Sequence, residues 1–365
     1  MNIIIIIIFF ILFLSWSFIK NNHNKTTIFL FIIAISFLTS IRNDSVPDTK
    51  NYREYYNALE GIESFIFYTF ELGFQCYSYI LKIILKGNDK LYFFCITFMN
   101  SILIFDALKR IQQLIKSNTN SAINPLLYGL VFLFSYYGLF YNAITIRAGI
   151  AMALYIQAFS FLCKDDLATS DKIKIFIICF LAYFFHKSSV IFWMILFLAH
   201  FMPRLSKRTY LLIILFSCLI FFSRVNILVL NVFNSFFEKI INILSNSNLD
   251  TISLYRETIT EEETKLSFKF MFQLFSGFLF LSVRFISMPK MYFYFLNIYY
   301  IGLVLGAFLA PITMMYRVLD YFLILTFILY MFWVQSTKLP FRLVFIISSG
   351  AILYQLILFY RVIIP

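Results

Sequence analysis

Charged residues are scarce in this chain of 365 residues. Asp, Glu, Lys and Arg make up 13% of the sequence, whereas hydrophobic residues make up 61%. An ordinary soluble domain carries about 25% charged residues, so this chain cannot cover its surface with polar groups. The composition therefore excludes a soluble enzyme, a disordered protein and, despite a net charge of +12, a nucleic-acid-binding protein. It predicts an all-α, polytopic membrane protein with a single transmembrane domain over residues 1–365, because helices pair their own backbone polar groups in lipid.

Motifs for a disulfide framework or a bound metal are also missing. The five cysteines form no CxxC pair, and four of them lie in apolar runs. The segments that we expect to face outward contain no DxD motif, and the triplet at 261–263 (EEE) is typical of a solvated acidic loop. We therefore expect a site with no cofactor and no metal.

The beginning of the sequence lacks the marks of a cleaved signal peptide. Residues 2–19 carry no charge, and no small-x-small cleavage site follows them. Together with the next apolar run, 26–41, they predict a retained helical hairpin. Ten further apolar runs bring the expected number of transmembrane helices to about 12, since each span needs roughly 17–25 residues. These runs cover residues 91–108, 124–141, 146–163, 173–186, 187–202, 209–222, 267–286, 290–310, 315–335 and 341–362.

Two more apolar runs, 64–86 and 224–243, are ambiguous, and the basic residues decide how they are placed. Lys and Arg favour cytoplasmic loops. If both runs lie in the outer interface, half of the 30 Lys and Arg residues but only four of the 18 Asp and Glu residues fall on one side of the membrane. We expect this side to be cytoplasmic and both termini to be outside. Segments 42–90 and 223–266 are then extracytoplasmic loops with interfacial helices.

Ionisable residues in or beside a span are functional candidates, because they cost about 2.5–3.5 kcal/mol at mid-helix on insertion scales. Asp48 follows the second span and either caps a short helix or directs a carboxylate into an outward-facing cavity, as a base or a sugar-hydroxyl acceptor. His186 ends an apolar run. A continuous helix from 173 to 202 would place a basic cluster outside, so we expect a break near His186. This histidine is either an interfacial turn residue or a general base or phosphate donor.

Two arginines are candidates for binding phosphate. Arg147 opens the span 146–163 and is either an interfacial side chain or a cation whose planar fork matches phosphate oxygens. Arg317 and Asp320 are three residues apart and share one helix face. They form either a neutralised structural pair or a second phosphate ligand, Arg317, that Asp320 orients. The predicted topology places Asp48, Arg147, His186 and Arg317 on the same face of the membrane.

Five short motifs, in this order, resemble those of the EpsG-like and Wzy-type polysaccharide polymerases of bacterial envelopes. They are residues 47–52 (PDTKNY), 70–74 (FELGF), 146–151 (IRAGIA), 185–190 (FHKSSV) and Arg317 with Tyr321 and Phe322. The resemblance covers roughly residues 1–335. An Arg-Gln pair is commoner in the arginine motif, where this chain has Arg147 followed by Ala148.

The resemblance implies a multi-pass protein of the glycosyltransferase-C type in the bacterial plasma membrane, with its active site facing the periplasm. Such proteins join undecaprenyl-diphosphate-linked repeat units of O-antigen or a similar surface polysaccharide, and analogy adds a chain-length regulator as a partner. Both the donor and the acceptor glycan are then carried by membrane lipid.

In this chemistry, we expect Arg147 and Arg317, rather than a metal, to neutralise the diphosphate. Asp48 or His186 removes the proton from the acceptor hydroxyl. Supporting roles are expected for Asp320, Tyr52, Tyr321 and Glu71. An O-antigen ligase shares the donor chemistry, and a lipid-linked oligosaccharide flippase or transporter has a similar number of spans, so both stay open as alternatives.

Overall fold

A computed structural model describes most of the chain, and all regular structure in the described residues is helical. The predicted all-α class is therefore confirmed. The described residues are 25–67, 69–118, 136–164, 166–228, 268–309, 316–336, 350 and 353–360. The first expected helix, 2–19, and most of the run 224–243 lie outside them. The chain divides into two compact units, one of Met1–Leu196 with Lys338–Pro365 and one of Phe197–Thr337. A single transmembrane domain stays a prediction.

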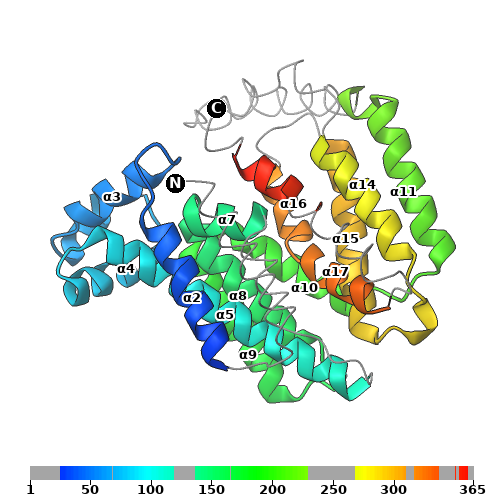
Figure 1. Ribbon diagram of the computed structural model, residues 1–365, viewed down its shortest axis with the longest axis horizontal. Helices are drawn as coiled ribbons and strands as arrows, with labels where there is room; N and C mark the ends of the chain where they lie inside the picture. Colours follow the sequence, from blue (N-terminus) through cyan, green and yellow to red (C-terminus); the bar gives the residue numbers. More distant parts are fainter. Residues whose placement is uncertain are drawn as a thin grey trace, which may run out of the picture. The chain divides into compact units, whose positions relative to one another are not determined.

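The central helix of the first unit is α8 (Ile146–Leu162). It packs against α5 (Asp89–Asn118) and α9 (Thr169–Phe185), and α5 packs in turn against α2 (Lys25–Ser40) (Figure 1). Nearly every side chain of α8 is buried. Small residues near the start of α8 let neighbouring backbones approach closely, as in packed membrane helices. They are Ala148, Gly149, Ala151 and Ala153.

Several predicted spans match helices closely. The runs 26–41, 146–163, 209–222 and 290–310 correspond to α2, α8, α11 (Lys207–Phe222) and α15 (Lys290–Leu309), with ends that agree within two residues. Charged or polar residues flank each of these apolar runs, so hydropathy alone locates where the helices begin and end.

The segment between α2 and α5, which is expected to be extracytoplasmic, folds into short helices next to the candidate residues Asp48 and Glu71. These are α3 (Thr49–Ala58), η1 (Ile62–Phe67) and α4 (Leu72–Leu85). In α4, the side chains of Phe74 and Leu81 are buried, whereas Ile80, Ile83 and Ile84 are exposed. A helix of 14 residues is about 21 Å long, which is shorter than the hydrocarbon core of about 30 Å. This length and the one-sided burial suit the expected interfacial helix.

The chain breaks at His186, as the distribution of basic residues predicts. The helix α9 ends at Phe185, a single 3-10 turn (η2, Lys187–Ser189) follows, and α10 (Val190–Phe201) continues the chain. His186 has an extended backbone, with φ −159° and ψ 114°. The break is therefore confirmed, and it leaves the imidazole on a segment with no regular helix.

The second unit is built around α15, which is buried along most of its length. It contacts α11, α14 (Phe268–Leu281), α16 (Tyr316–Leu323) and α17 (Thr326–Ser336). The last two lie within the apolar run 315–335 that is predicted as one span, and a two-residue turn at 324–325 separates them. The Thr326 hydroxyl donates to the Leu323 carbonyl at 2.5 Å, so a side chain takes a backbone acceptor at the turn between the two helices.

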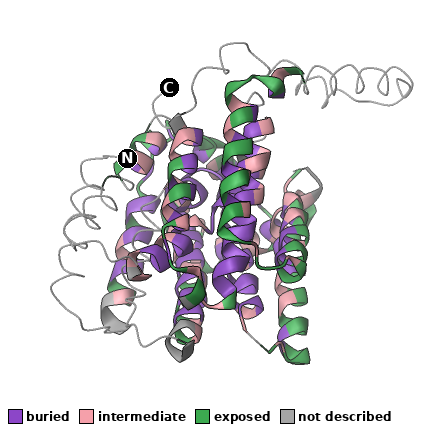
Figure 2. Ribbon diagram, turned by 90° about the vertical axis from the view of Figure 1, so that its right-hand side faces the viewer, coloured by how far each residue is buried: buried purple, intermediate pink, exposed green. Residues whose placement is uncertain are grey.

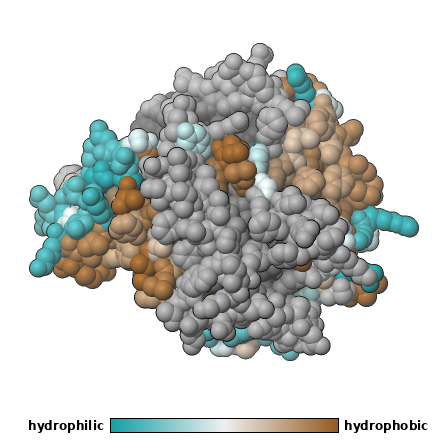
Figure 3. All heavy atoms as spheres, viewed as in Figure 1, coloured by the Kyte–Doolittle hydropathy of each residue, from teal (hydrophilic) through white to brown (hydrophobic). Residues whose placement is uncertain are grey.

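Exposed apolar faces are found in both units. The helices carry buried residues on one side and exposed residues on the other (Figure 2). The helix α11 exposes Leu212, Leu215 and Leu219, and hydrophobic atoms cover the region of α11 in Figure 3. In the part of the chain that the structure describes, two helical segments, Asp89–Leu114 and Lys290–Leu309, are long and apolar enough to cross a membrane, and six shorter apolar helices accompany them. These faces fit lipid contact. The number of 12 spans stays a prediction.

Candidate functional site

Glu71 lies at the centre of a polar cluster in the first unit. It is the N-cap residue of α4, and its backbone carbonyl accepts a hydrogen bond from the backbone N–H of Gln75. Gly73, in the first turn, brings α4 close to the end of α9. A Cβ atom at Gly73 would lie 2.8 Å from the backbone oxygen and 2.9 Å from the Cβ atom of Phe184. The absence of a side chain at Gly73 therefore lets Glu71 reach the residues that follow α9.

Both carboxylate oxygens of Glu71 accept hydrogen bonds. Arg147 Nη1 donates to Oε2 at 2.5 Å. The ring Nδ1 of His186 lies 3.2 Å from Oε1, and the backbone N–H of Lys187 donates to the same oxygen at 3.2 Å. Arg147 lies 76 positions and His186 lies 115 positions after Glu71 in the sequence. The structure thus brings together residues from three of the sequence motifs.

The environment keeps Glu71 ionised. Burial disfavours the charged form, but the hydrogen bond from His186, the charge of Arg147 and two backbone hydrogen bonds outweigh it, and the pKa of Glu71 falls to about 2. A carboxylate can only accept hydrogen bonds, so Nδ1 of His186 carries the proton of the shared hydrogen bond. In neutral His186, the second ring nitrogen, Nε2, is then the unprotonated one and can accept a hydrogen bond. The His186 side chain is 25% exposed and the Glu71 side chain 8%.

Arg147 lies in the first turn of α8. Its Nε donates to the hydroxyl oxygen of Tyr52 at 3.4 Å, and its guanidinium carbon lies 4.4 Å from the centre of the Phe70 ring. The side chain is 23% exposed. A Cβ atom at Gly149 would lie 2.0 Å from the backbone oxygen of Tyr141, so the start of α8 packs directly on the preceding backbone. The guanidinium is thus fixed on two edges, and Nη2 has no hydrogen bond among the described residues.

Tyr52 is a buried core residue whose hydroxyl reaches the site. Burial raises its pKa; the charge of Arg147 and the hydrogen bond from it act in the opposite direction, and the charge of Asp48 adds to the rise. The ring packs against Phe70 and Phe74. A neutral phenol at this position supports Arg147, and the ring itself is covered by other aromatic side chains.

Asp48 occupies the N-cap position of α3, as one of its two interpretations predicts, but its side chain makes no capping hydrogen bond. Its φ of 61° is in the left-handed region, which aspartate tolerates better than most residues. The side chain is exposed. Its backbone oxygen accepts a hydrogen bond from the backbone N–H of Tyr52 at 3.0 Å, and its side chain makes no hydrogen bond with the other candidate residues that the structure describes.

A second buried arginine, Arg42, was not singled out from the sequence. Its side chain is 3% exposed, and Nη1 donates to the backbone oxygen of Ala143 at 2.5 Å, at the end of α7 (Tyr136–Ala143). The guanidinium carbon lies 3.5 Å from the centre of the Phe93 ring. A cation at the C-terminus of a helix complements the helix dipole. The signal in the sequence is an arginine directly after the apolar run 26–41.

The other site candidates belong to the second unit. Asp320 is 2% exposed, and its Oδ1 accepts a hydrogen bond from Lys269 Nζ at 3.1 Å. Lys269 was not considered as a partner for Asp320 in the sequence analysis. Tyr321 is buried in the same helix, α16. The Arg317 side chain lies outside the described residues, so both its predicted pairing with Asp320 and its gathering with Asp48, Arg147 and His186 stay predictions.

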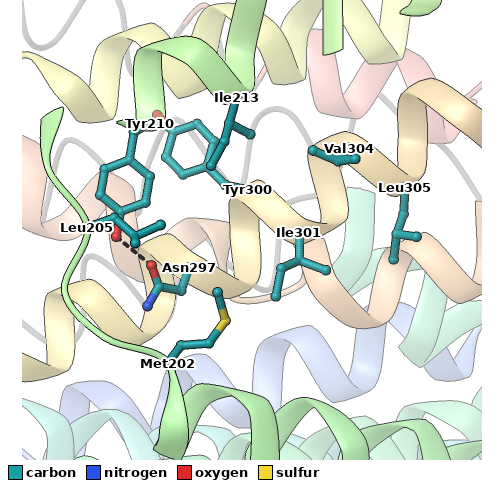
Figure 4. A pocket seen from close by; sticks show the side chains of 9 residues that line it. All are labelled: Met202, Leu205, Tyr210, Ile213, Asn297, Tyr300, Ile301, Val304 and Leu305. Carbon is teal, nitrogen blue, oxygen red and sulfur yellow. Dashed lines mark hydrogen bonds between the residues drawn. The ribbon is translucent and has the colours of Figure 1, made fainter. Parts of the chain in front are cut away.

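The second unit also contains an apolar cavity of about 220 Å³. Figure 4 shows side chains of α11 and α15 lining it, with the Tyr210 hydroxyl donating to Oδ1 of Asn297 at 2.5 Å at one end. The Asn297 amide donates in turn to the backbone oxygen of Pro203. These polar groups satisfy one another, and the remaining lining is aliphatic or aromatic. The cavity suits hydrocarbon better than a sugar.

Fold and site together define a helical membrane protein with a polar site in which one carboxylate joins an arginine and a histidine. The chain belongs to the EpsG family, because the family model matches residues 25–364. The family is associated with polysaccharide polymerases, so the predicted resemblance is confirmed and a membrane protein of polysaccharide biosynthesis with glycosyltransferase-like polymerase activity is indicated. No curated protein and no solved structure matches the chain.

Proposed function

We propose that this protein joins oligosaccharide repeat units that are linked to undecaprenyl diphosphate, as in the Wzy-type polymerisation of O-antigen or a similar surface polysaccharide. The reaction takes place at the outer face of the bacterial plasma membrane. The observation that carries the proposal is the hydrogen-bonded group of Glu71, Arg147 and His186, which supplies a phosphate-binding cation and a proton-transfer group in one place.

The chemistry needs both groups. The bond between the anomeric carbon of the donor glycan and its diphosphate oxygen breaks, and a hydroxyl oxygen of the acceptor glycan forms the new glycosidic bond. The hydroxyl proton passes to a base, and undecaprenyl diphosphate leaves. Negative charge grows on the diphosphate as it departs, and a cation already held in position stabilises this charge without reorganisation.

Arg147 is the cation for this step in the first unit. Two of its nitrogens are held by Glu71 and Tyr52, so the guanidinium plane is oriented, and Nη2 makes no hydrogen bond among the described residues. A planar fork recognises phosphate oxygens in a bidentate manner. We assign Arg317 as the second cation and Asp320 as its supporting residue, and we expect turnover to be independent of added metal.

Polysaccharide analysis of a deletion strain tests this function. We expect the long-chain lipopolysaccharide ladder to disappear on a gel while a single repeat unit on the core is retained, and a plasmid-borne copy of the gene to restore the ladder. A core without any repeat unit would instead indicate a ligase or a flippase. Purified protein in liposomes that contain undecaprenyl-diphosphate-linked repeat units should form longer products in the presence of EDTA, and a strict requirement for Mg²⁺ would contradict the arginine-based mechanism.

A further inference from the structure

We infer that His186, rather than Asp48, is the base that accepts the proton of the acceptor hydroxyl, and that Glu71 is the positioning residue that holds both this base and Arg147. The inference rests on the proposed function and adds the assignment of roles within that site. Its basis is the geometry around the Glu71 carboxylate.

The first argument is the tautomer of His186. Oε1 of Glu71 accepts a hydrogen bond from the backbone N–H of Lys187 and lies 3.2 Å from Nδ1 of His186. Because a carboxylate oxygen can only accept, Nδ1 must be the donor in this contact. In neutral His186 the proton therefore resides on Nδ1 and the lone pair on Nε2. A carboxylate that fixes the histidine tautomer in this way is also found in the catalytic triads of hydrolases.

The second argument is the rigidity of the segment. The backbone N–H of His186 donates to the carbonyl of Ala182, and its own carbonyl accepts from the N–H of Ser189. The main chain on both sides of the histidine is thus hydrogen-bonded, and Glu71 fixes the orientation of the ring. A base acts efficiently when it is held in place relative to the proton that it removes.

The third argument is the contrast with Asp48. Its carboxylate is exposed and makes no capping hydrogen bond. The solvated charge of Asp48 acts on Tyr52 from outside, whereas the lone pair on His186 Nε2 belongs to a partly exposed ring that is anchored on its other side.

Proton transfer follows from this arrangement. The acceptor hydroxyl gives its proton to Nε2 of His186 as its oxygen attacks the anomeric carbon, and the resulting imidazolium donates to an ionised Glu71. The other oxygen of Glu71 binds Arg147, which stabilises the leaving diphosphate. One carboxylate therefore sets where the proton acceptor lies relative to the leaving group.

The experiment uses full-length protein in liposomes and measures kcat and the donor KM for chain extension. In His186→Asn, the amide nitrogen still donates to Glu71, but the basic Nε2 is gone. We expect kcat to fall by about 10²–10⁴-fold with the donor KM changed by less than about threefold, as for loss of a general base. His200→Asn is the matched control, because His200 lies in α10 outside this cluster and should retain wild-type kinetics.

A second variant tests the positioning role. Glu71→Ala alone should lower kcat and raise the donor KM, because both His186 and Arg147 lose their anchor. In the His186→Asn background, the same change should lower kcat by a clearly smaller factor, since the part of its effect that passes through His186 is already lost and only the part that passes through Arg147 remains. A purely structural role of Glu71 predicts instead that its effect on kcat is as large in both backgrounds.

The outcomes separate the two levels of the proposal. Failure of the wild-type protein to extend chains would refute the proposed function. A different result would overturn the present inference and leave the polymerase function intact: the wild type extends chains, His186→Asn has the same kcat as the wild type, and Asp48→Asn shows no turnover.

Discussion

Replacing Gly73 by alanine tests how tightly the site depends on the approach of α4 to α9. The new Cβ atom would lie 2.9 Å from the Cβ atom and 2.8 Å from the backbone oxygen of Phe184. Carbon atoms in contact are about 3.5–4.0 Å apart, so the two helix ends must separate by roughly 0.6–1 Å. Rotation of a side chain cannot relieve the clash, because the opposing atoms are backbone and Cβ atoms.

This displacement acts directly on the contact between Glu71 and His186. The Oε1···Nδ1 distance of 3.2 Å is at the upper end of the normal hydrogen-bond range, so a shift of this size breaks the bond. A misplacement of about 1 Å costs on the order of 10²-fold in rate. We expect kcat of Gly73→Ala to fall by about 10–100-fold, measured as the initial rate of chain extension in liposomes with undecaprenyl-diphosphate-linked repeat units.

The matched control is Gly61→Ala, in the same segment between α2 and α5. A Cβ atom at Gly61 would meet no atom within 4 Å, so this variant should keep the wild-type rate. Both proteins should elute as the wild type does in size-exclusion chromatography, since the helices themselves are preserved. Wild-type activity in Gly73→Ala would show that the reaction does not need the close contact of α4 with α9, and the argument for Glu71 as a positioning residue would fail.

Three further predictions concern charges. Arg147→Ala should abolish chain extension while the protein stays in the membrane. Arg147→Lys should retain only part of the wild-type activity, because a point charge replaces a planar fork. Full activity of the alanine variant would reject the proposed cation. The pKa of Glu71 is about 2 in the folded protein against 4.5 for the free side chain, so its contribution to stability is present above about pH 4.5 and is lost as the pH falls towards 2. The melting temperature of the wild type should therefore drop more steeply than that of Glu71→Gln on acidification, and parallel curves would contradict this. Asp320→Asn removes the buried carboxylate that pairs with the Lys269 ammonium and should cost about 3–5 kcal/mol of stability. Part of this loss should be regained in Asp320→Leu/Lys269→Met, and denaturation in detergent would measure both.

The helices of the fold could largely be predicted because their ends coincide with polar residues. The run 146–163 becomes α8, and the break at His186 follows from the position of basic clusters on either side of it. The break between α16 and α17 could not be found in this way. At this turn the Thr326 hydroxyl donates to the Leu323 carbonyl, and such a hydrogen bond leaves no trace in hydropathy.

The site was predictable as a set of candidates but not as a geometry. The motifs identify Glu71, Arg147 and His186, yet they give Glu71 only a supporting role, because contacts over 76 and 115 residues depend on how helices pack. Lys269 was missed as the partner of Asp320 for the same reason. Arg42 was missed because one basic residue at the end of an apolar run is ordinary in membrane proteins.

Four polar residues of the candidate site share one structural feature, since each lies where a helix begins or ends. Arg147 opens α8, Glu71 and Asp48 precede α4 and α3, and His186 follows α9. Hydrogen bonds to one another hold the side chains of Glu71, Arg147 and His186 at these positions. The apolar core beneath them does not depend on those bonds. Single substitutions in the cluster should therefore reduce kcat far more than they reduce stability, and a melting temperature that falls in proportion to activity would show that the cluster serves the fold.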